Sequence, residues 1–164
     1  MRMRPEYPAT VRAIWKKDLA ELKRLLADPL RINEMDPDGR TPLMAAAIES
    51  DVAALRLLLG SGAEVNLQDP AGWSALHFAV QEPSSYEVCL ALLNAGARHD
   101  LRESHGNTPL FIAVINARGS GDLIRLLRSR GAVPLAANHS GVSPCALARR
   151  IANYPVAQFF ADLP

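Results

Sequence analysis

A short phrase recurs four times along the chain at nearly constant spacing. It begins at Gly39, Gly72, Gly106 and Gly141, and it reads Gly-Arg-Thr-Pro-Leu, Gly-Trp-Ser-Ala-Leu, Gly-Asn-Thr-Pro-Leu and Gly-Val-Ser-Pro-Cys. The glycines lie 33, 34 and 35 residues apart. A phrase that returns at this period indicates one structural unit stacked on copies of itself, not a single globular core. Such a stack has an elongated surface, and surfaces of this kind bind other macromolecules.

Within each unit the residues predict a turn, two short helices and a glycine stop. In the first full unit Asp36 and Asp38 belong to a turn, and Thr41 is expected to cap the first helix. Asp51 is expected to cap the second helix, and Gly62 suits the left-handed residue that ends it. Helices are predicted over 11–17 (capped by Thr10), 19–26, 43–49, 52–59, 88–93, 123–127 and 155–160, with others opened by Ser74, Thr108 and Ser143.

The chain is therefore predicted to form one all-α solenoid domain over residues 1–164. Its units are an N-terminal cap over 9–35, three repeats over 36–68, 69–102 and 103–137, and a C-terminal cap over 138–164. The turn between paired helices lengthens from 49–51 through 81–85 to 116–122, which explains the drift in spacing. Irregular turns of this kind argue against a synthetic consensus scaffold.

Composition narrows the class of protein. Hydrophobic residues make up 49% and charged residues 21%, which is typical of soluble domains. A formal charge of +1 gives no electrostatic case for binding nucleic acid. No apolar run is long enough to span a membrane, and none follows Met1–Pro8 to form a secretory signal. A cytoplasmic location is expected, and the excess of arginine over lysine favours a GC-rich, bacterial source.

These recurring residues resemble the ankyrin repeat family. The matching residues are Asp38-Gly39-Arg40-Thr41-Pro42-Leu43, Leu58-Leu59, Gly62-Ala63 and Val65-Asn66, and the pattern returns in every unit. The histidine of the family phrase survives only as His77, and Val-Asn becomes His99-Asp100 and then Val133-Pro134. These departures are expected to loosen the hydrogen bonds between repeats and to leave the apolar core intact.

The resemblance implies a hand-like molecule that binds another protein and is a monomer when free. The turns would project as fingers, and the first helices would form a concave palm. By family position, the partner-binding residues on the fingers would be Arg40, Gln68, Pro70, Trp73, Arg102, Ser104, His105 and Asn107. Those on the palm would be Ile48, Glu49, Gln81, Glu82, Ile115 and Asn116.

Trp73 has two interpretations. It follows a turn glycine at the finger position that Arg40, Asn107 and Val142 occupy in the other units. An exposed tryptophan there would be a binding hot spot. Alternatively, its ring lies flat against the adjacent finger. Tyr7 and Trp15, in the N-terminal cap, are interpreted as packing residues.

The residues indicate no catalytic, cofactor or metal site. None of the four histidines pairs with another histidine or a cysteine at metal-ligand spacing, and His77 is interpreted as a structural residue. His105 and His139 lie on predicted turns. Cys89 and Cys145 fall in apolar helices, where thiols are inert core residues of a reducing compartment.

The sequence thus predicts a non-enzymatic binding module. An immunity or antidote protein that blocks a toxin is one concrete hypothesis, and a regulator of a neighbouring enzyme fits equally well. The alternative from another class is a small-ligand-binding protein or an enzyme whose site is not recognisable from sequence.

Overall fold

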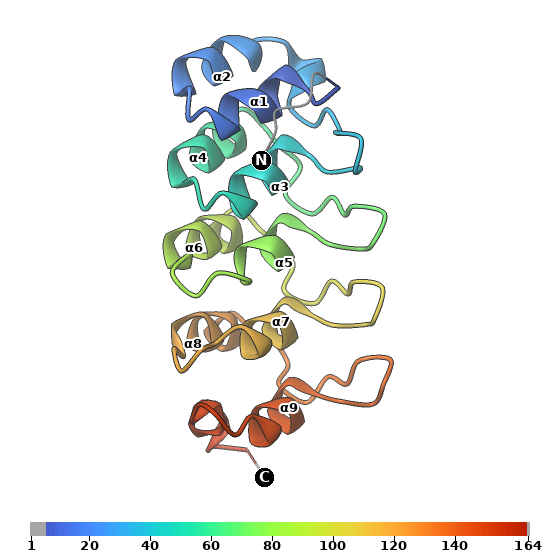
Figure 1. The fold of residues 1–164 in the computed structure, drawn as a ribbon, viewed down its shortest axis with the longest axis vertical. Helices are drawn as coiled ribbons and strands as arrows, with labels where there is room; N and C mark the ends of the chain where they lie inside the picture. Colours follow the sequence, from blue (N-terminus) through green and yellow to red (C-terminus); the bar gives the residue numbers. More distant parts are fainter. Residues whose placement is uncertain (1–5, 164) are drawn as a thin grey trace.

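The computed structural model describes residues 6–163, which form layers of helix pairs stacked along one axis (Figure 1). Within these residues no strand forms, and one isolated antiparallel bridge joins Gln68 to Ser74. The elements are α1 (Ala9–Trp15), α2 (Leu19–Leu25), the 3-10 helix η1 (Pro29–Arg31), α3 (Pro42–Ile48), α4 (Val52–Gly60), α5 (Ala75–Ala79), α6 (Tyr86–Asn94), α7 (Pro109–Ile115), α8 (Asp122–Ser129), α9 (Pro144–Arg150) and the 3-10 helix η2 (Val156–Phe160).

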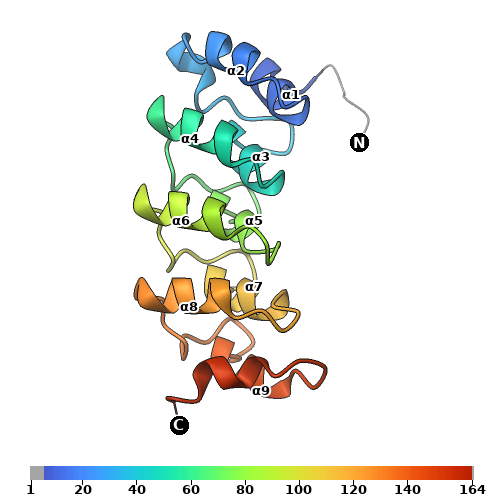
Figure 2. The ribbon, with the colours of Figure 1, turned by 90° about the vertical axis from the view of Figure 1, so that its left-hand side faces the viewer.

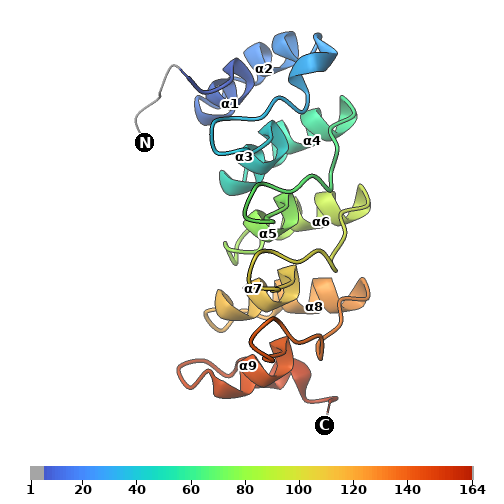
Figure 3. The ribbon, with the colours of Figure 1, turned by 90° about the vertical axis from the view of Figure 1, so that its right-hand side faces the viewer.

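The helices form two adjoining rows (Figures 2 and 3). The first helices, α1, α3, α5, α7 and α9, contact one another in that order, and so do the second helices α2, α4, α6 and α8. The loop before each first helix from α3 to α9 projects away from the second helices, on the right in Figure 1. We call these loops finger 1 (36–40), finger 2 (69–73), finger 3 (103–107) and finger 4 (138–142), and the surface formed by the first helices beside them the palm. The all-α solenoid is confirmed.

Small side chains set the spacing between the first helices. Ala46, Ala79, Ala113 and Ala148 occupy the same position in successive first helices, and all are buried. Leucines fill the matching core positions of the second helices, where Leu58, Leu92 and Leu127 are all fully buried. One apolar core therefore runs the length of the stack, as expected for repeats that bury their faces only against neighbours.

The predicted helix signals are confirmed in the first full repeat. The Thr41 hydroxyl accepts the backbone N–H of Met44 at 3.3 Å, and Asp51 accepts that of Ala54 at 3.0 Å. Gly62 has a φ of +92°, the left-handed region that glycine enters without a Cβ clash.

The predicted cap at Thr10 is wrong. Helix α1 begins two residues earlier than predicted, at Ala9, because Pro8 has an extended backbone and its carbonyl accepts the N–H of Arg12 at 3.1 Å. Thr10 lies inside the first turn, fully buried, and makes no cap hydrogen bond. Other predicted ends shift by one or two residues, and the last helix is a 3-10 helix. Pro164 of the C-terminal cap, and residues 1–5 of the stretch examined for a secretory signal, lie outside the described residues.

Leu58→Ala should destabilise the stack by about 2 to 5 kcal/mol, because it leaves a cavity in the continuous core. Urea unfolding followed by circular dichroism measures this change. Leu30→Ala is the matched control, since Leu30 is 86% exposed and should change the free energy of unfolding by less than about 0.5 kcal/mol. Equal losses for the two variants would contradict the proposed core.

Candidate protein-binding surface

A single polar side chain organises each finger from its first residue. Asp36 Oδ1 accepts the backbone N–H groups of Asp38 and Arg40, both at 2.9 Å. In the same way Asp69 Oδ1 accepts the backbone N–H groups of Ala71 and Trp73. Asn138 Oδ1 accepts those of Ser140 and Val142, and Glu103 accepts that of Asn107. These side chains hold the turns of the fingers, as the sequence predicted for Asp36.

Neighbouring fingers touch at their glycines. Gly72 and Gly106 have φ values of +84° and +80°. A Cβ on Gly72 would lie 2.9 Å from Glu103 Cα, and one on Gly106 would lie 2.8 Å from the backbone nitrogen of His139. Each glycine is therefore required twice, for its turn and for the close approach of the next finger.

Fingers 2, 3 and 4 form a continuous hydrogen-bond ladder. Gln68 Nε2 donates to the carbonyl of Arg102 at 3.1 Å, and Arg102 Nη1 donates to the carbonyl of Ala137 at 2.8 Å. Backbone bonds run beside them, from Ser104 N to Ala71 O at 2.9 Å and from His139 N to His105 O at 3.0 Å. Asn107 Oδ1 accepts from Asn138 Nδ2 at 2.8 Å. The polar ends of Gln68, Arg102 and Asn107, proposed from sequence as partner contacts, are thus bound within the stack.

Finger 1 is not part of this ladder. Pro70 occupies the finger position at which Ser104 and His139 donate a backbone N–H to the preceding finger, and proline has no N–H. Met35 occupies the position at which the side chains of Gln68 and Arg102 donate to a carbonyl of the next unit, and the methionine side chain has no N–H to donate. Among the described residues, the polar contact between fingers 1 and 2 is the ion pair of Arg40 Nε with Asp69 Oδ2 at 3.7 Å. The Arg40 guanidinium also lies over the Phe78 ring, 5.1 Å from its centroid.

His77 ties the second repeat to the third. It is fully buried, its Nδ1 accepts the backbone N–H of Ser74 at 3.2 Å, and its Nε2 lies 3.3 Å from the carbonyl oxygen of Asn107. An accepting Nδ1 leaves the proton on Nε2, so the ring is neutral and donates to Asn107. Burial lowers the pKa of His77, because the charged imidazolium would lose its hydration. The structural role predicted for His77 is confirmed.

The palm residues predicted from sequence lie at the ends of the first helices. Ile48 ends α3 and is 43% exposed, and Ile115 ends α7 and is 53% exposed. Gln81, at the equivalent position after α5, is exposed between them. Glu82 is exposed, whereas Glu49 and Asn116 are half-buried, and Asn116 donates to the carbonyl of Ile112 at 3.0 Å. The structure therefore places these residues along one row of the palm.

Trp73 lies partly in the palm. Its ring is half-buried and contacts the next helix, with centroids 5.3 Å from Phe78 and 5.8 Å from His77. The part that stays exposed faces a hollow of about 460 Å³ lined by Arg40, Ile48, Asp69, Trp73, Phe78 and Gln81. Trp73 thus combines packing within its own repeat with a surface open to a partner.

A smaller hollow of about 60 Å³ adjoins the first and shares Arg40 and Ile48 with it. Its other walls include Tyr7, Trp15, Asp36, Asp38 and Glu49. We call the two together the double hollow. The rings of Tyr7 and Trp15 pack with centroids 4.9 Å apart, and the Tyr7 hydroxyl donates to Asp38 Oδ2 at 2.8 Å. Both rings pack against the core as the sequence predicted, and both also line this surface.

Sequence reasoning did not place Phe78, Tyr7 or Trp15 in the site. For Phe78 a signal existed, because the other first helices hold Ala45, Ile112 and Leu147 at its position. An aromatic ring there, combined with Trp73 in the same repeat, marks the second repeat as different. Tyr7 and Trp15 lie in the atypical cap, outside any repeat position, so no comparison between units could reveal them.

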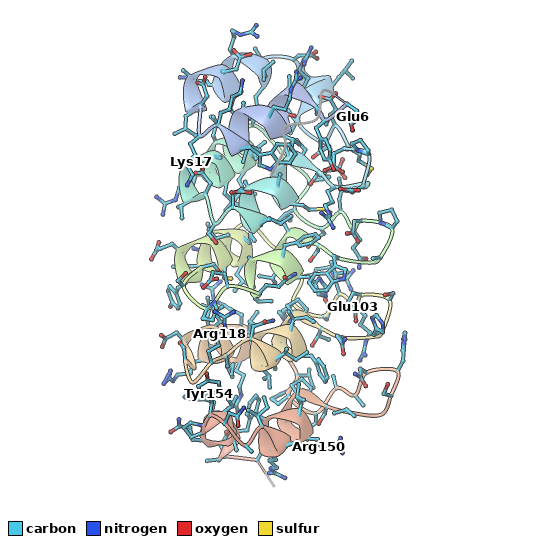
Figure 4. All side chains as sticks on the ribbon, viewed as in Figure 1. Glu6, Lys17, Glu103, Arg118, Arg150 and Tyr154 are labelled. Atoms are coloured by element: carbon cyan, nitrogen blue, oxygen red, sulfur yellow. The ribbon has the colours of Figure 1, made fainter. Side chains whose placement is uncertain are left out.

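The remaining candidate groups have structural partners or are buried. His105 lies exposed on finger 3 with Nδ1 2.8 Å from Glu103 Oε2, and Figure 4 shows Glu103 on the finger edge. Burial opposes the charge of Glu103, but hydrogen bonds from His105 and from the Asn107 backbone outweigh it and lower the pKa of that carboxyl. Cys89 and Cys145 are buried free thiols, and burial raises the pKa of Cys89 to about 11.

Over residues 6–163, no three His, Cys, Asp or Glu side chains converge to hold a metal ion. The helices of the same stretch are all too short or too polar to cross a membrane.

Gly106→Ala should destabilise the protein more than Gly62→Ala, although both glycines have positive φ. The left-handed strain of about 1 to 2 kcal/mol applies to both variants. Only Gly106 faces a neighbouring finger, since nothing lies within 4 Å of a Cβ built on Gly62. Chemical denaturation of both variants measures the difference. Equal destabilisation would contradict close finger contact.

Stability should fall as the pH drops below about 6.5, because the unfolded chain then binds a proton that folded His77 refuses. The loss from this residue reaches at most about 1.4 kcal/mol per pH unit. His77→Met is the matched variant, since methionine stands at the equivalent position in the first repeat as Met44. Urea titrations from pH 7.5 to 5 should show a weaker pH dependence in this variant. An unchanged pH profile would contradict the role of His77.

Comparison with known protein families agrees with this geometry. A family model described as "Ankyrin repeats (3 copies)" matches residues 11–103, and one described as "Ankyrin repeat" matches residues 105–139. A comparison with curated proteins found no match. The two family matches together cover well over half of the sequence, from α1 to finger 4. The chain belongs to the ankyrin repeat family.

Proposed function

We propose that this chain is a protein-binding module that holds a partner protein against its palm and fingers. Ankyrin repeats are generally protein–protein interaction modules and are typically non-catalytic. The observation that carries the proposal is the pair of exposed isoleucines on the palm. Ile48 and Ile115 stand at equivalent helix ends, with polar Gln81 and Glu82 between them. Exposed apolar side chains set among polar ones are typical of a protein interface.

The finer role that we propose is steric inhibition of the partner. An immunity protein that covers a toxin's active site and a regulator of a neighbouring enzyme would both use this surface. A cytoplasmic setting and a free monomer belong to the same proposal, and the buried free thiols Cys89 and Cys145 fit a reducing compartment. Co-expression with a toxin encoded by an adjacent gene tests this role. Failure to rescue growth or to form a complex on gel filtration would rule out the antidote.

The alternative is a small-ligand site or an enzyme. The larger hollow, at about 460 Å³, lies within the size range of small-molecule pockets. Stoichiometric binding of a metal ion or cofactor by the purified protein would support this alternative against the interaction module.

Ile48→Arg and Ile115→Arg should each weaken partner binding at least about tenfold, because each buries a charge at an apolar contact of the interface. The partner is captured with the native protein as bait, and its affinity for each variant is then measured by calorimetry. Ala53→Arg is the control, since Ala53 is exposed on α4 in the row of second helices. A loss of affinity for Ala53→Arg alone would show that the partner binds that row.

A further inference from the structure

The double hollow differs in charge from the chain as a whole. The sequence carries a formal charge of +1. Among the described residues, the walls of the double hollow hold four carboxylates, Asp36, Asp38, Glu49 and Asp69, against the single guanidinium of Arg40. Carboxylates in a groove with apolar walls focus a negative potential on whatever enters it. Charge complementarity therefore favours a cation as the occupant.

The cation that residues 6–163 contribute to the double hollow is already paired. Arg40 pairs with Asp69 at 3.7 Å and with Asp38 at 3.9 Å, and it stacks over Phe78. The carboxylate of Glu49, by contrast, makes no hydrogen bond or ion pair with any of residues 6–163, although the residue is half-buried. Glu49 thus presents a free negative charge beside Trp15 and Ile48.

Aromatic rings line the same groove. Tyr7 and Trp15 form a contiguous pair in the smaller hollow, and Trp73 and Phe78 form another in the larger one. A guanidinium or ammonium group is attracted to the face of such rings, most strongly to tryptophan. A carboxylate next to an indole therefore suits a basic side chain whose stem is apolar and whose end is charged.

Because the hydrogen-bond ladder does not extend to finger 1, a backbone carbonyl at this groove has no donor from the next finger. The carbonyls of Ala71 and His105 each accept an N–H from the next finger. The equivalent carbonyl of Asp38 accepts none within residues 6–163, because Pro70 lacks the N–H. An extended segment of a partner supplies backbone donors of the kind that this carbonyl lacks.

We infer that the double hollow binds an arginine or lysine side chain of an extended partner segment. The inference rests on the proposed function and names the chemistry that the palm recognises. The basic group pairs with Glu49 and lies against Trp15, while an apolar neighbour on the same segment contacts Ile48 and Trp73.

The two tryptophans of the chain report on this site directly, because one lines each hollow. Their indole N–H signals are followed by nitrogen-15 NMR and assigned with the variants Trp15→Phe and Trp73→Phe. The protein is titrated with acetyl-Leu-Arg-amide, with its lysine and glutamate counterparts, and with the neutral citrulline dipeptide. The arginine and lysine dipeptides should shift both signals, and citrulline should bind at least about tenfold more weakly.

Glu49→Gln should weaken the arginine dipeptide at least about fivefold and reduce its salt dependence. Glu87→Gln is the matched control, since Glu87 is exposed on α6 and pairs with Arg56 at 3.6 Å. Glu87→Gln should bind as the unsubstituted protein does. Four results would each overturn the inference. The arginine and citrulline dipeptides bind equally well, or the glutamate dipeptide binds more tightly than the arginine dipeptide. The tryptophan indole signals do not shift, or Glu49→Gln binds the arginine dipeptide as the unsubstituted protein does.

The proposed function is tested separately by the captured partner. If Ile48→Arg and Ile115→Arg weaken that partner while no dipeptide binds, the palm interacts without a basic anchor and only the inference fails. If the arginine dipeptide binds and Ile48→Arg leaves the partner's affinity unchanged, the double hollow is a cation site and the proposed palm interface is wrong.

Discussion

The close approach of neighbouring fingers constrains the whole molecule. Finger 3 lies so near finger 2 that a Cβ on Gly72 would clash with its backbone, and finger 4 stands in the same relation to Gly106. The small residues Ala46, Ala79 and Ala113 set the matching distance between the first helices. Spacing at the fingers and spacing in the core must agree, since both are fixed by the same repeat. The palm between them is therefore a surface of defined width.

The ties between repeats change from one edge of the stack to the other. Near the N-terminus, Asn33 accepts from Glu64 N at 3.0 Å and Asn66 accepts from Arg98 N at 2.8 Å, in the linkers that follow the second helices. Asp100, at the next equivalent position, pairs instead with Arg98 of its own repeat. From finger 2 onward, the hydrogen-bond ladder of the fingers joins the repeats instead. The departure at His99-Asp100 removes the linker bond, but the finger ladder joins the same repeats, so the expected loosening of the hydrogen bonds between repeats is wrong there. The double hollow lies where the finger ladder is missing.

Much of the fold could be predicted from sequence because each unit carries its own local signals. Thr41, Asp51 and Gly62 act within a few residues of their own positions, so the printed sequence suffices to place them. Thr10 misled the prediction because a threonine can cap a helix or be buried in its first turn, and only packing decides between them. The length of the α7–α8 turn did not reveal that this turn packs against the last unit. Gly119 and Gly121 of the α7–α8 turn lie against Tyr154 and Phe159 of the last unit, and Figure 4 shows Arg118 and Tyr154 on neighbouring layers.

The candidate site was predictable only in part. Family position identifies Ile48 and Ile115 as palm residues, because helix register alone decides which side chains face outward. It does not reveal that the side chains of Gln68 and Arg102 donate hydrogen bonds to carbonyls of the next unit, because those bonds depend on the distance between repeats. Family position also does not predict that Tyr7 and Trp15 line the same hollow as Glu49, since these residues come from different units.

Hydrogen–deuterium exchange of the complex with its captured partner tests most directly whether the palm is the binding surface. Slower exchange is expected at the ends of α3 and α7, around Ile48 and Ile115, and in fingers 1 and 2. The amides of α4, α6 and α8 should exchange as they do in the free protein. Protection confined to those second helices, with the palm unchanged, would contradict the account.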